Sequence, residues 1–463
     1  MSANAASGWL ERQFKLSRLG TNVQTEIIAG LTTFMVMSYI IAVNPATLNM
    51  GGSGLDVTQV ATVTCLIAGI MSIAMGLYTN RAVAIAPGLG INAVVAYTLV
   101  GSMGLTFPEA MGVVVTEGLI ITLLVVTGVR KYVLEMVPMV LKKAISVGIG
   151  AFILFLGLKN AGLITFFGTP EGDPFGRIDM SHLNTWPIFV AVVGFVVTIV
   201  LMAMNVKAAI FWGIIASTVV AFIVPGDVAK MPDEPFSGPD FSLIGDVSFG
   251  YFTELGILTA ILVVISLMLT DFFDTMGTLI GVGSQAGYLD ENGELPDAEK
   301  PLLIDSLGAV GGGLVSSSSA TAYVESTAGV AAGGRSGLVV VVTGLLFLLM
   351  IPFVSLVEAI PGVATAPALI VVGLLMLGAL SDDEHGRHVI DWNNMEDAFP
   401  IGLTLLVMPM TMNITYGIGA GFVSWVMIKV ARGKAREVNI AMWAVGILFL
   451  LYFLRFALFD AQF

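Results

Sequence analysis

A long succession of apolar segments is the feature that most constrains what this chain can fold into. About fourteen of them are long enough to span or half-span a bilayer, whose hydrocarbon core takes about 20 apolar residues per helix. Hydrophobic residues make up 56% of the 463 positions and charged residues 11%, against about 25% charged in an average soluble protein. The sequence therefore predicts an all-α polytopic membrane protein. Its expected spans are 26–44, 59–78, 82–101, 109–129, 139–158, 185–204, 208–225, 255–282, 301–319, 320–333, 337–357, 366–381, 398–412 and 414–430.

Charge and side-chain content exclude several other classes of protein. A single cysteine excludes a disulfide scaffold, and the net charge of −13 excludes a nucleic-acid partner, because it would repel phosphates. The histidines, His182, His385 and His388, are scattered over polar stretches, so we expect no metal or haem site and no cofactor. Residues 1–22 are mostly polar and do not resemble a signal peptide.

Polar stretches divide the chain into five parts. The basic residues that flank the spans fall on one side of the membrane if the N-terminus starts in the cytoplasm, so the positive-inside rule predicts a cytoplasmic N-terminus. The apolar run 439–459 could be an additional span or a helix lying along the membrane surface. The parts are a cytoplasmic N-terminal segment (1–22), a first seven-span repeat (23–225), a polar connecting loop (226–254), a second seven-span repeat (255–431), and a basic linker with a C-terminal apolar segment (432–463).

The two halves resemble each other faintly. MVPMVLKKAISVGIGA at 136–151 aligns with AIPGVATAPALIVVGL at 359–374, and further dipeptides match in the same order. An odd number of spans per repeat inverts the second repeat relative to the first, as in secondary transporters that bind substrate near the bilayer midplane. The matching dipeptides are Gly118-Leu119 with Gly344-Leu345, Gly76-Leu77 with Gly313-Leu314, and Thr25-Glu26 with Thr253-Glu254.

The third span of each half is broken. AVAIAPGLGINAVVAY at 82–97 and SSSSATAYVESTAGVAAGG at 316–334 are interrupted by proline or glycine, and each starts with a stretch more typical of extended chain than of helix. Broken helices at corresponding positions direct free backbone N–H groups at a ligand. These two segments are therefore the expected binding site.

Five acidic residues lie in spans that are otherwise almost free of charge: Glu117, Asp271, Asp274, Asp305 and Glu325. An ionised carboxylate in hydrocarbon costs several kcal/mol, so such residues usually face a substrate or proton path. Glu117 and Asp305 could equally be helix caps or buried hydrogen-bonding partners. Asp271 and Asp274 share one helical face, where mutual repulsion and desolvation would allow the pair to bind and release a proton.

Glu325 and Asn92 are the polar side chains of the two broken segments. A carboxylate can accept two adjacent N–H groups of a flat heterocycle, while the Asn92 amide both donates and accepts, or alternatively satisfies the backbone of the broken helix. No lysine or arginine is expected deep in a span, which favours a neutral N–H-bearing substrate or a cation over an anion. Gly277 and Gly281 form a small-xxx-small pair that predicts close approach of another helix.

Six long motifs resemble the AzgA-like purine permeases of the nucleobase:cation symporter-2 (nucleobase-ascorbate transporter) family. The likeness covers nearly the whole chain, and the motifs are far longer than a chance pattern match. They are ERQFKL..LGTNVQTEIIAGLTTFMVMSYIIAVNP (11–45), APGLGINAVVAY (86–97), GIGAFILFLGLKNAG (148–162), DFFDTMGTLIGVGSQAG (271–287), TAYVESTAGVAAGGRSGL (321–338) and ATAPALIVVG (364–373).

The resemblance implies about fourteen spans in two inverted seven-span repeats, arranged as a core domain and a gate domain, with short strands in the two broken spans. It implies that Asp274 and Glu325 bind substrate with the third-span amide of Asn92, and that Asp271 is an additional essential acid. Asp271, Asp274 and Glu325 are accordingly the expected proton-coupling residues. Family members transport hypoxanthine, guanine or adenine with protons, while the serine-rich SSSSATAYVES leaves the preferred base open.

The expected function is proton-symport import of purine nucleobases across the plasma membrane by alternating access. The expected partners are the purine base and the lipid bilayer, and the resemblance allows a homodimer. No nucleophile–base pair is visible, so we expect no enzyme. The alternatives are an anion transporter or exchanger of related fold, and a nucleobase symporter that uses Na+ in place of H+.

Overall fold

The computed structural model describes residues 8–49, 53–128, 137–167, 177–181, 183–232, 238–290, 295–380 and 390–459. The histidines His182, His385 and His388 lie outside these residues. Eight helices of the described part are long and apolar enough to cross a membrane by themselves. Four shorter apolar helices accompany them, Leu89–Ser102, Ala209–Ile223, Gly362–Met376 and Ile440–Leu454.

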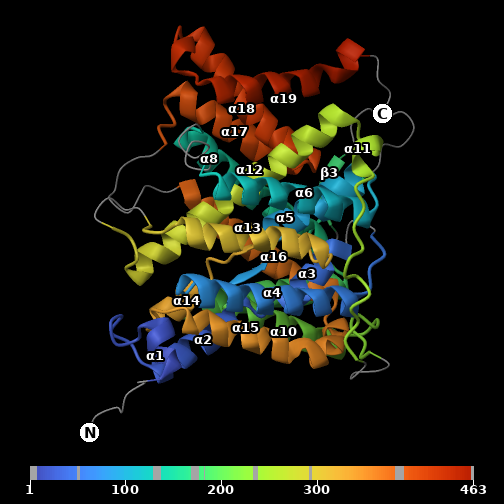
Figure 1. Cartoon of the computed structure of the whole chain (residues 1–463). Helices are drawn as coiled ribbons and strands as arrows, with labels where there is room; N and C mark the ends of the chain where they lie inside the picture. Colours follow the sequence, from blue (N-terminus) through green and yellow to red (C-terminus); the bar gives the residue numbers. More distant parts are fainter. Residues whose placement is uncertain are drawn as a thin grey trace.

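The helices run roughly parallel to one another in a single bundle (Figure 1). The first half of the chain contains α1 (Trp9–Phe14), α2 (Val23–Met37), α3 (Ile40–Asn49), α4 (Val57–Thr79), β1 (Ile85–Pro87), α5 (Leu89–Ala93), the π-helix η1 (Val94–Ser102), α6 (Phe107–Val126), α8 (Met139–Asn160), β2 (Ile164–Phe167), β3 (Arg177–Met180), α9 (Trp186–Ala203) and α10 (Ala209–Ile223). The second half contains α11 (Tyr251–Glu254), α12 (Ile257–Ala286), α13 (Glu299–Leu314), β4 (Ala320–Ala322), α14 (Ser326–Ala331), α15 (Leu338–Met350), the 3-10 helices η2 (Ile351–Ala359) and η3 (Leu377–Leu380), α16 (Gly362–Met376), α17 (Met395–Thr411), α18 (Ile414–Ala431), η4 (Ala435–Glu437) and α19 (Ile440–Phe459).

Local sequence signals set several of these boundaries. Asp56 and Gln59 form a capping box at the start of α4, and Thr106 and Glu109 do the same for α6. The expected span 301–319 is too long, because α13 ends at Leu314. Its end is a turn that folds the chain back toward the helix, with positive φ at Ser316 and Ser318. The β2–β3 hairpin was not expected from the sequence.

The helices pack into two groups. Most contacts of α2–α6 are with one another and with α12–η2, and we call this set, residues 23–126 and 257–359, the site group. Helices α8–α10 pack chiefly with α16–α18, and we call that set, residues 139–223 and 362–431, the flanking group. The two strands β1 and β4 pair inside the site group.

Glycines bring the helices of the two halves into close contact. A Cβ on Gly118 of α6 would lie 2.7 Å from the Val310 backbone nitrogen of α13, and one on Gly344 of α15 would lie 2.5 Å from the Gly69 carbonyl oxygen of α4. Gly150 of α8 and Gly373 of α16 face each other, since a Cβ on Gly373 would lie 2.6 Å from the Gly150 carbonyl oxygen. Gly118, Gly344, Gly150 and Gly373 belong to matches between the two halves of the sequence, and each lies where a helix of one half crosses a helix of the other.

Two other expectations about small or matching residues were wrong. Nothing described lies within 4 Å of a Cβ built on Gly277 or Gly281, because both glycines are on an exposed face of α12. The Thr25-Glu26 and Thr253-Glu254 match is not structural either. Glu26 is buried and accepts backbone N–H groups of Arg335 and Ser336, whereas Glu254 is exposed at the end of α11.

The C-terminal helix α19 runs back along α18, as Figure 1 shows at the top of the bundle. Gly446 lies against Val426, and further along α19 the ring of Phe449 is 6.1 Å from that of Phe422. The order of these contacts makes the two helices antiparallel. Helix α19 therefore packs lengthwise against α18, and whether it crosses the membrane stays a prediction.

Candidate functional site

The two broken segments meet through a short antiparallel sheet. β1 pairs with β4 so that Ala86 lies opposite Thr321, and every residue of both strands is buried. The Tyr323 N–H extends the pairing by donating to the Ala84 carbonyl, and the Gly88 N–H donates to the Ser319 carbonyl. The expectation that both segments start with extended chain is therefore confirmed. Because the strands are antiparallel, the helices that follow them run toward opposite ends of the bundle.

Glu325 lies directly before α14 and is half-buried. Its carboxylate does not cap this helix; Oε1 instead accepts a hydrogen bond of 2.5 Å from the Tyr39 hydroxyl. Tyr39 lies at the break between α2 and α3, and sequence reasoning did not identify it. No signal in the sequence pointed to a partner 286 residues away.

Asp271 and Asp274 lie one helical turn apart on α12, as expected. Asp274 is half-buried and interacts electrostatically with Glu325 and with Asp305 of α13. Asp271 is 1% exposed, and its Oδ2 atom accepts a long hydrogen bond of 3.4 Å from Ser319. The structure therefore brings Asp271, Asp274 and Glu325 together, with Asp274 and Glu325 only partly buried.

Asp305 is a structural acceptor at the back of this cluster. Its carboxylate receives the Ala322 N–H at 2.8 Å and the hydroxyls of Thr275 and Thr321 at 2.7 and 3.2 Å. These contacts tie α12, α13 and β4 together. Of the two readings that the sequence left open for Asp305, the buried hydrogen-bonding partner is confirmed.

Asn92 lies in α5, immediately beyond β1, and is fully buried. Neither its Oδ1 nor its Nδ2 atom has a hydrogen-bond partner among the described residues. The side chain therefore does not satisfy the backbone of the broken helix within the described part of the chain. Because α5 also contacts α12, the amide of Asn92 is held near the helix that carries Asp271 and Asp274.

Two lysines of α8 lie against aromatic rings of the site group. The Lys142 ammonium lies 5.7 Å from the Phe273 ring centroid, and that of Lys159 lies 5.2 Å from the Tyr97 ring centroid. The two lysines stand near opposite ends of α8. In the described ranges no group of three or more His, Cys, Asp or Glu side chains is arranged to hold a metal ion.

Known proteins share both the sequence and the fold of this chain. The chain is 39% identical to adenine permease AdeQ of Escherichia coli (strain K12), over 96% of each chain. It is 37% identical to guanine/hypoxanthine permease PbuO of Bacillus subtilis (strain 168), over 94% of this chain and 98% of that protein. The transmembrane domain of the cyanobacterial bicarbonate transporter BicA has the same fold, with a TM-score of 0.59 at 16% identity, over 86% of this chain and 97% of that domain.

The family model for xanthine/uracil permeases, described as Permease family, matches residues 24–451. This range includes the paired strands β1 and β4, the helices of the site group and the flanking group, and each acidic residue of the site. Its curated relatives are permeases and not enzymes, in agreement with the expectation from the sequence. The chain is thus a multi-pass membrane protein that belongs to the xanthine/uracil permease family.

Proposed function

We propose that this protein imports purine nucleobases together with protons by alternating access. The observation that carries the proposal is the pair of half-buried carboxylates, Asp274 and Glu325, beside the paired strands β1 and β4. The same site group contains the Asn92 amide, which has no hydrogen-bond partner among the described residues. A purine presents adjacent N–H donors and ring acceptors in one plane, which such a set can match. The likeness to adenine and guanine/hypoxanthine permeases supports purines as the substrate class.

Each site residue has a role in this proposal. Glu325, already oriented by Tyr39, accepts ring or exocyclic N–H groups of the base. Asn92 orders another edge of the base through its amide donor and acceptor, neither of which is paired with a described residue. Asp274 shares both substrate binding and the coupling proton, and Asp271 influences the charge state of Asp274 from one helical turn away.

The architecture supports alternating access. We propose fourteen spans in two inverted seven-span repeats, and the paired glycine contacts between the halves support this arrangement. In this scheme the site group is the core domain that holds the base, and it moves against the flanking group, which is the gate domain. Assembly as a homodimer belongs to the same proposal and would be measured by light scattering in detergent.

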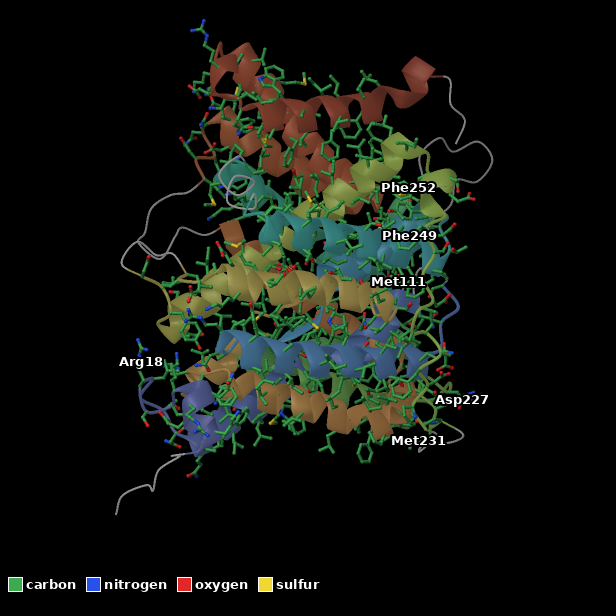
Figure 2. All side chains as sticks on the ribbon, in the orientation of Figure 1. Arg18, Met111, Asp227, Met231, Phe249 and Phe252 are labelled. Carbon is green, nitrogen blue, oxygen red and sulfur yellow. The ribbon has the colours of Figure 1, made fainter. Side chains whose placement is uncertain are left out.

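Membrane orientation follows from the ends of the bundle. Figure 2 shows Arg18 at one end and Asp227 and Met231 at the other. By the positive-inside rule we place the end with Arg18 and the N-terminus in the cytoplasm, with the protein in the plasma membrane. An inward H+ gradient then supplies about 1.4 kcal/mol per pH unit and about 2.3 kcal/mol per 100 mV.

Anion transport is the second candidate, because the BicA domain shares the fold. Similarity at 16% identity gives no information about the substrate. The half-buried charged side chains of the site are acidic, and they would repel an anion. Na+ in place of H+ is a third possibility that the acidic site also fits.

Uptake into proteoliposomes tests the proposal. Radiolabelled hypoxanthine and adenine would be offered with and without an imposed pH gradient, in sodium-free and sodium-containing buffer, with unlabelled guanine, xanthine and uracil as competitors. We expect gradient-dependent uptake in sodium-free buffer that one or two purines block. If purine uptake requires sodium, the coupling ion is Na+ and not H+. Bicarbonate uptake without purine uptake would favour the anion transporter.

A further inference from the structure

Glu117 is a buried acid that the proposed substrate site does not use. It lies in α6 and is 0% exposed, and α6 packs against both α12 and α13. The close contact of Gly118 with α13 forces this helix crossing at the residue next to Glu117. The acidic groups that face Glu117 from these helices are Asp271 of α12 and Asp305 of α13. On α11 the Tyr251 hydroxyl instead donates to Thr116, at 2.8 Å.

The hydrogen bonds around Glu117 differ from those around Asp305. The Asp305 carboxylate receives a backbone N–H and threonine hydroxyls, which suits the ionised form. Among the described residues, no hydroxyl, amide or backbone N–H donates to either carboxylate oxygen of Glu117. Asp271 Oδ1 likewise has no such donor in the described part of the chain, and Oδ2 receives a long contact of 3.4 Å from Ser319, with the Thr321 hydroxyl nearby.

Two adjacent buried carboxyls without donors cannot both stay ionised, because desolvation and mutual repulsion act together. Glu117 and Asp271 face each other across the crossing of α6 and α12, so the two carboxyls can share a hydrogen bond once one of them carries a proton. A proton shared between the two carboxyls would give each of them a hydrogen-bond partner, which no other described residue provides. Asp271 is in turn one helical turn from Asp274, which is only partly buried.

We propose that Glu117 and Asp271 share the proton that is coupled to transport, behind the substrate carboxylates, so that Glu117 is a proton-coupling residue that does not touch the base. This inference rests on the proposed function. In it, a proton passes between Asp274, on the solvent side, and the Glu117–Asp271 pair, and no other bond is made or broken. Substrate contacts remain with Glu325, Asp274 and Asn92.

The Glu117→Gln variant tests the role. Glutamine keeps the shape and donates a permanent N–H to Asp271, so the pair no longer needs a proton. We expect hypoxanthine or adenine binding within about threefold of wild type, together with retained exchange of labelled for unlabelled base. Accumulation driven by a gradient of one pH unit, at most about tenfold for one proton per base, should fall to no accumulation. Glu254→Gln, an exposed acid-to-amide change, is the matched control and should accumulate base like wild type.

The possible outcomes separate this inference from the proposed function. Wild-type protein that exchanges or accumulates no purine overturns the proposed function, and the inference falls with it. Wild-type accumulation that is unchanged in Glu117→Gln overturns the inference alone. Glu117→Asp keeps an acid at the position and should keep accumulation; loss in this variant equal to the loss in Glu117→Gln would make Glu117 a structural residue.

Infrared difference spectra decide the question if Glu117→Gln does not fold. Adding hypoxanthine or adenine to wild type should change a carboxylic-acid C=O band, since the proton moves as the base binds. We expect that band to shift in Glu117→Asp, because the acid at this position changes its geometry. Identical bands in wild type and Glu117→Asp would place the proton elsewhere and overturn the proposal.

Discussion

The two broken spans occupy corresponding positions in the two halves, but their neighbours differ. The first broken span, residues 85–102, faces the flanking group: the Tyr97 hydroxyl donates to the Asn160 side chain and the Thr98 hydroxyl to the Met412 carbonyl. The second broken span, residues 316–331, is enclosed by the site group. A Cβ on Gly312 of α13 would lie 2.1 Å from the Ser318 carbonyl oxygen.

This difference suggests a division of roles between the two spans. The second broken span is fixed against the backbone of its own group and presents Glu325 in one orientation. The first broken span carries Asn92 and continues into a nine-residue π-helix, a rare form whose single-turn examples are frequent at functional sites. Because the first broken span contacts the flanking group, we expect a movement between the two groups to displace Asn92 before it displaces Glu325.

The largest expected effect is that of Glu325→Gln, because it removes the charge from the fixed span. Two hydrogen bonds to a charged group contribute about 1.5–3 kcal/mol each, so purine binding should weaken by more than about 100-fold. Equilibrium binding of radiolabelled adenine and hypoxanthine to purified protein measures it. The exposed Glu254→Gln variant serves as control. Binding within threefold of wild type would remove Glu325 from the site.

The variants Gly312→Ala and Gly90→Ala test how closely each broken span is packed. Gly312 of α13 contacts the second broken span, and Gly90 belongs to the first. The new Cβ at position 312 meets backbone, whereas at position 90 it meets only the Ile149 Cγ2 atom, at 3.0 Å. Overpacking against backbone costs about 1–3 kcal/mol, so Gly312→Ala should lower the thermal midpoint by several degrees and Gly90→Ala by much less. Thermal unfolding in detergent measures both. Equal midpoints would contradict the difference in enclosure.

Asn92→Ala should reduce purine affinity by about tenfold, because a neutral hydrogen bond contributes about 0.5–1.5 kcal/mol. Its amide has no partner among the described residues, so the free protein loses no hydrogen bond seen there and the thermal midpoint should stay near that of wild type. Binding and thermal unfolding of the same preparation test both parts. A large fall in midpoint with unchanged affinity would return Asn92 to a structural role.

Tyr39→Phe should have the smallest effect, since it removes only the hydroxyl that orients Glu325. We expect affinity to fall by about fivefold, which corresponds to about 1 kcal/mol. Tyr323→Phe is the matched control, because its hydroxyl donates to the Pro87 carbonyl on the opposite strand and not to Glu325. If Tyr323→Phe weakened binding as much as Tyr39→Phe, orientation of Glu325 would not explain the effect.

Hydropathy and residue type predicted most of the helices and the two broken spans. The ends of α8, α9 and α18 lie within two residues of the expected spans, because a bilayer sets both the length and the composition of a crossing. Asp274 and Glu325 were also identified, because an acid in an apolar segment is conspicuous. The end of α13 was missed, because it depends on a chain reversal at Ser316 and Ser318 that hydropathy does not register.

The sequence by itself determined that the chain spans a membrane, where its helices break and which acids stand out, because these properties depend on neighbours along the chain. The tertiary structure decided which groups surround each acid. It placed Asp305 among donors, and within the described part of the chain it left Glu117 and Asp271 without comparable ones. It also brought Tyr39 to Glu325. The protonation and hydrogen bonding of a buried carboxyl depend on groups that are distant in sequence, and only the packing of the helices brings those groups together.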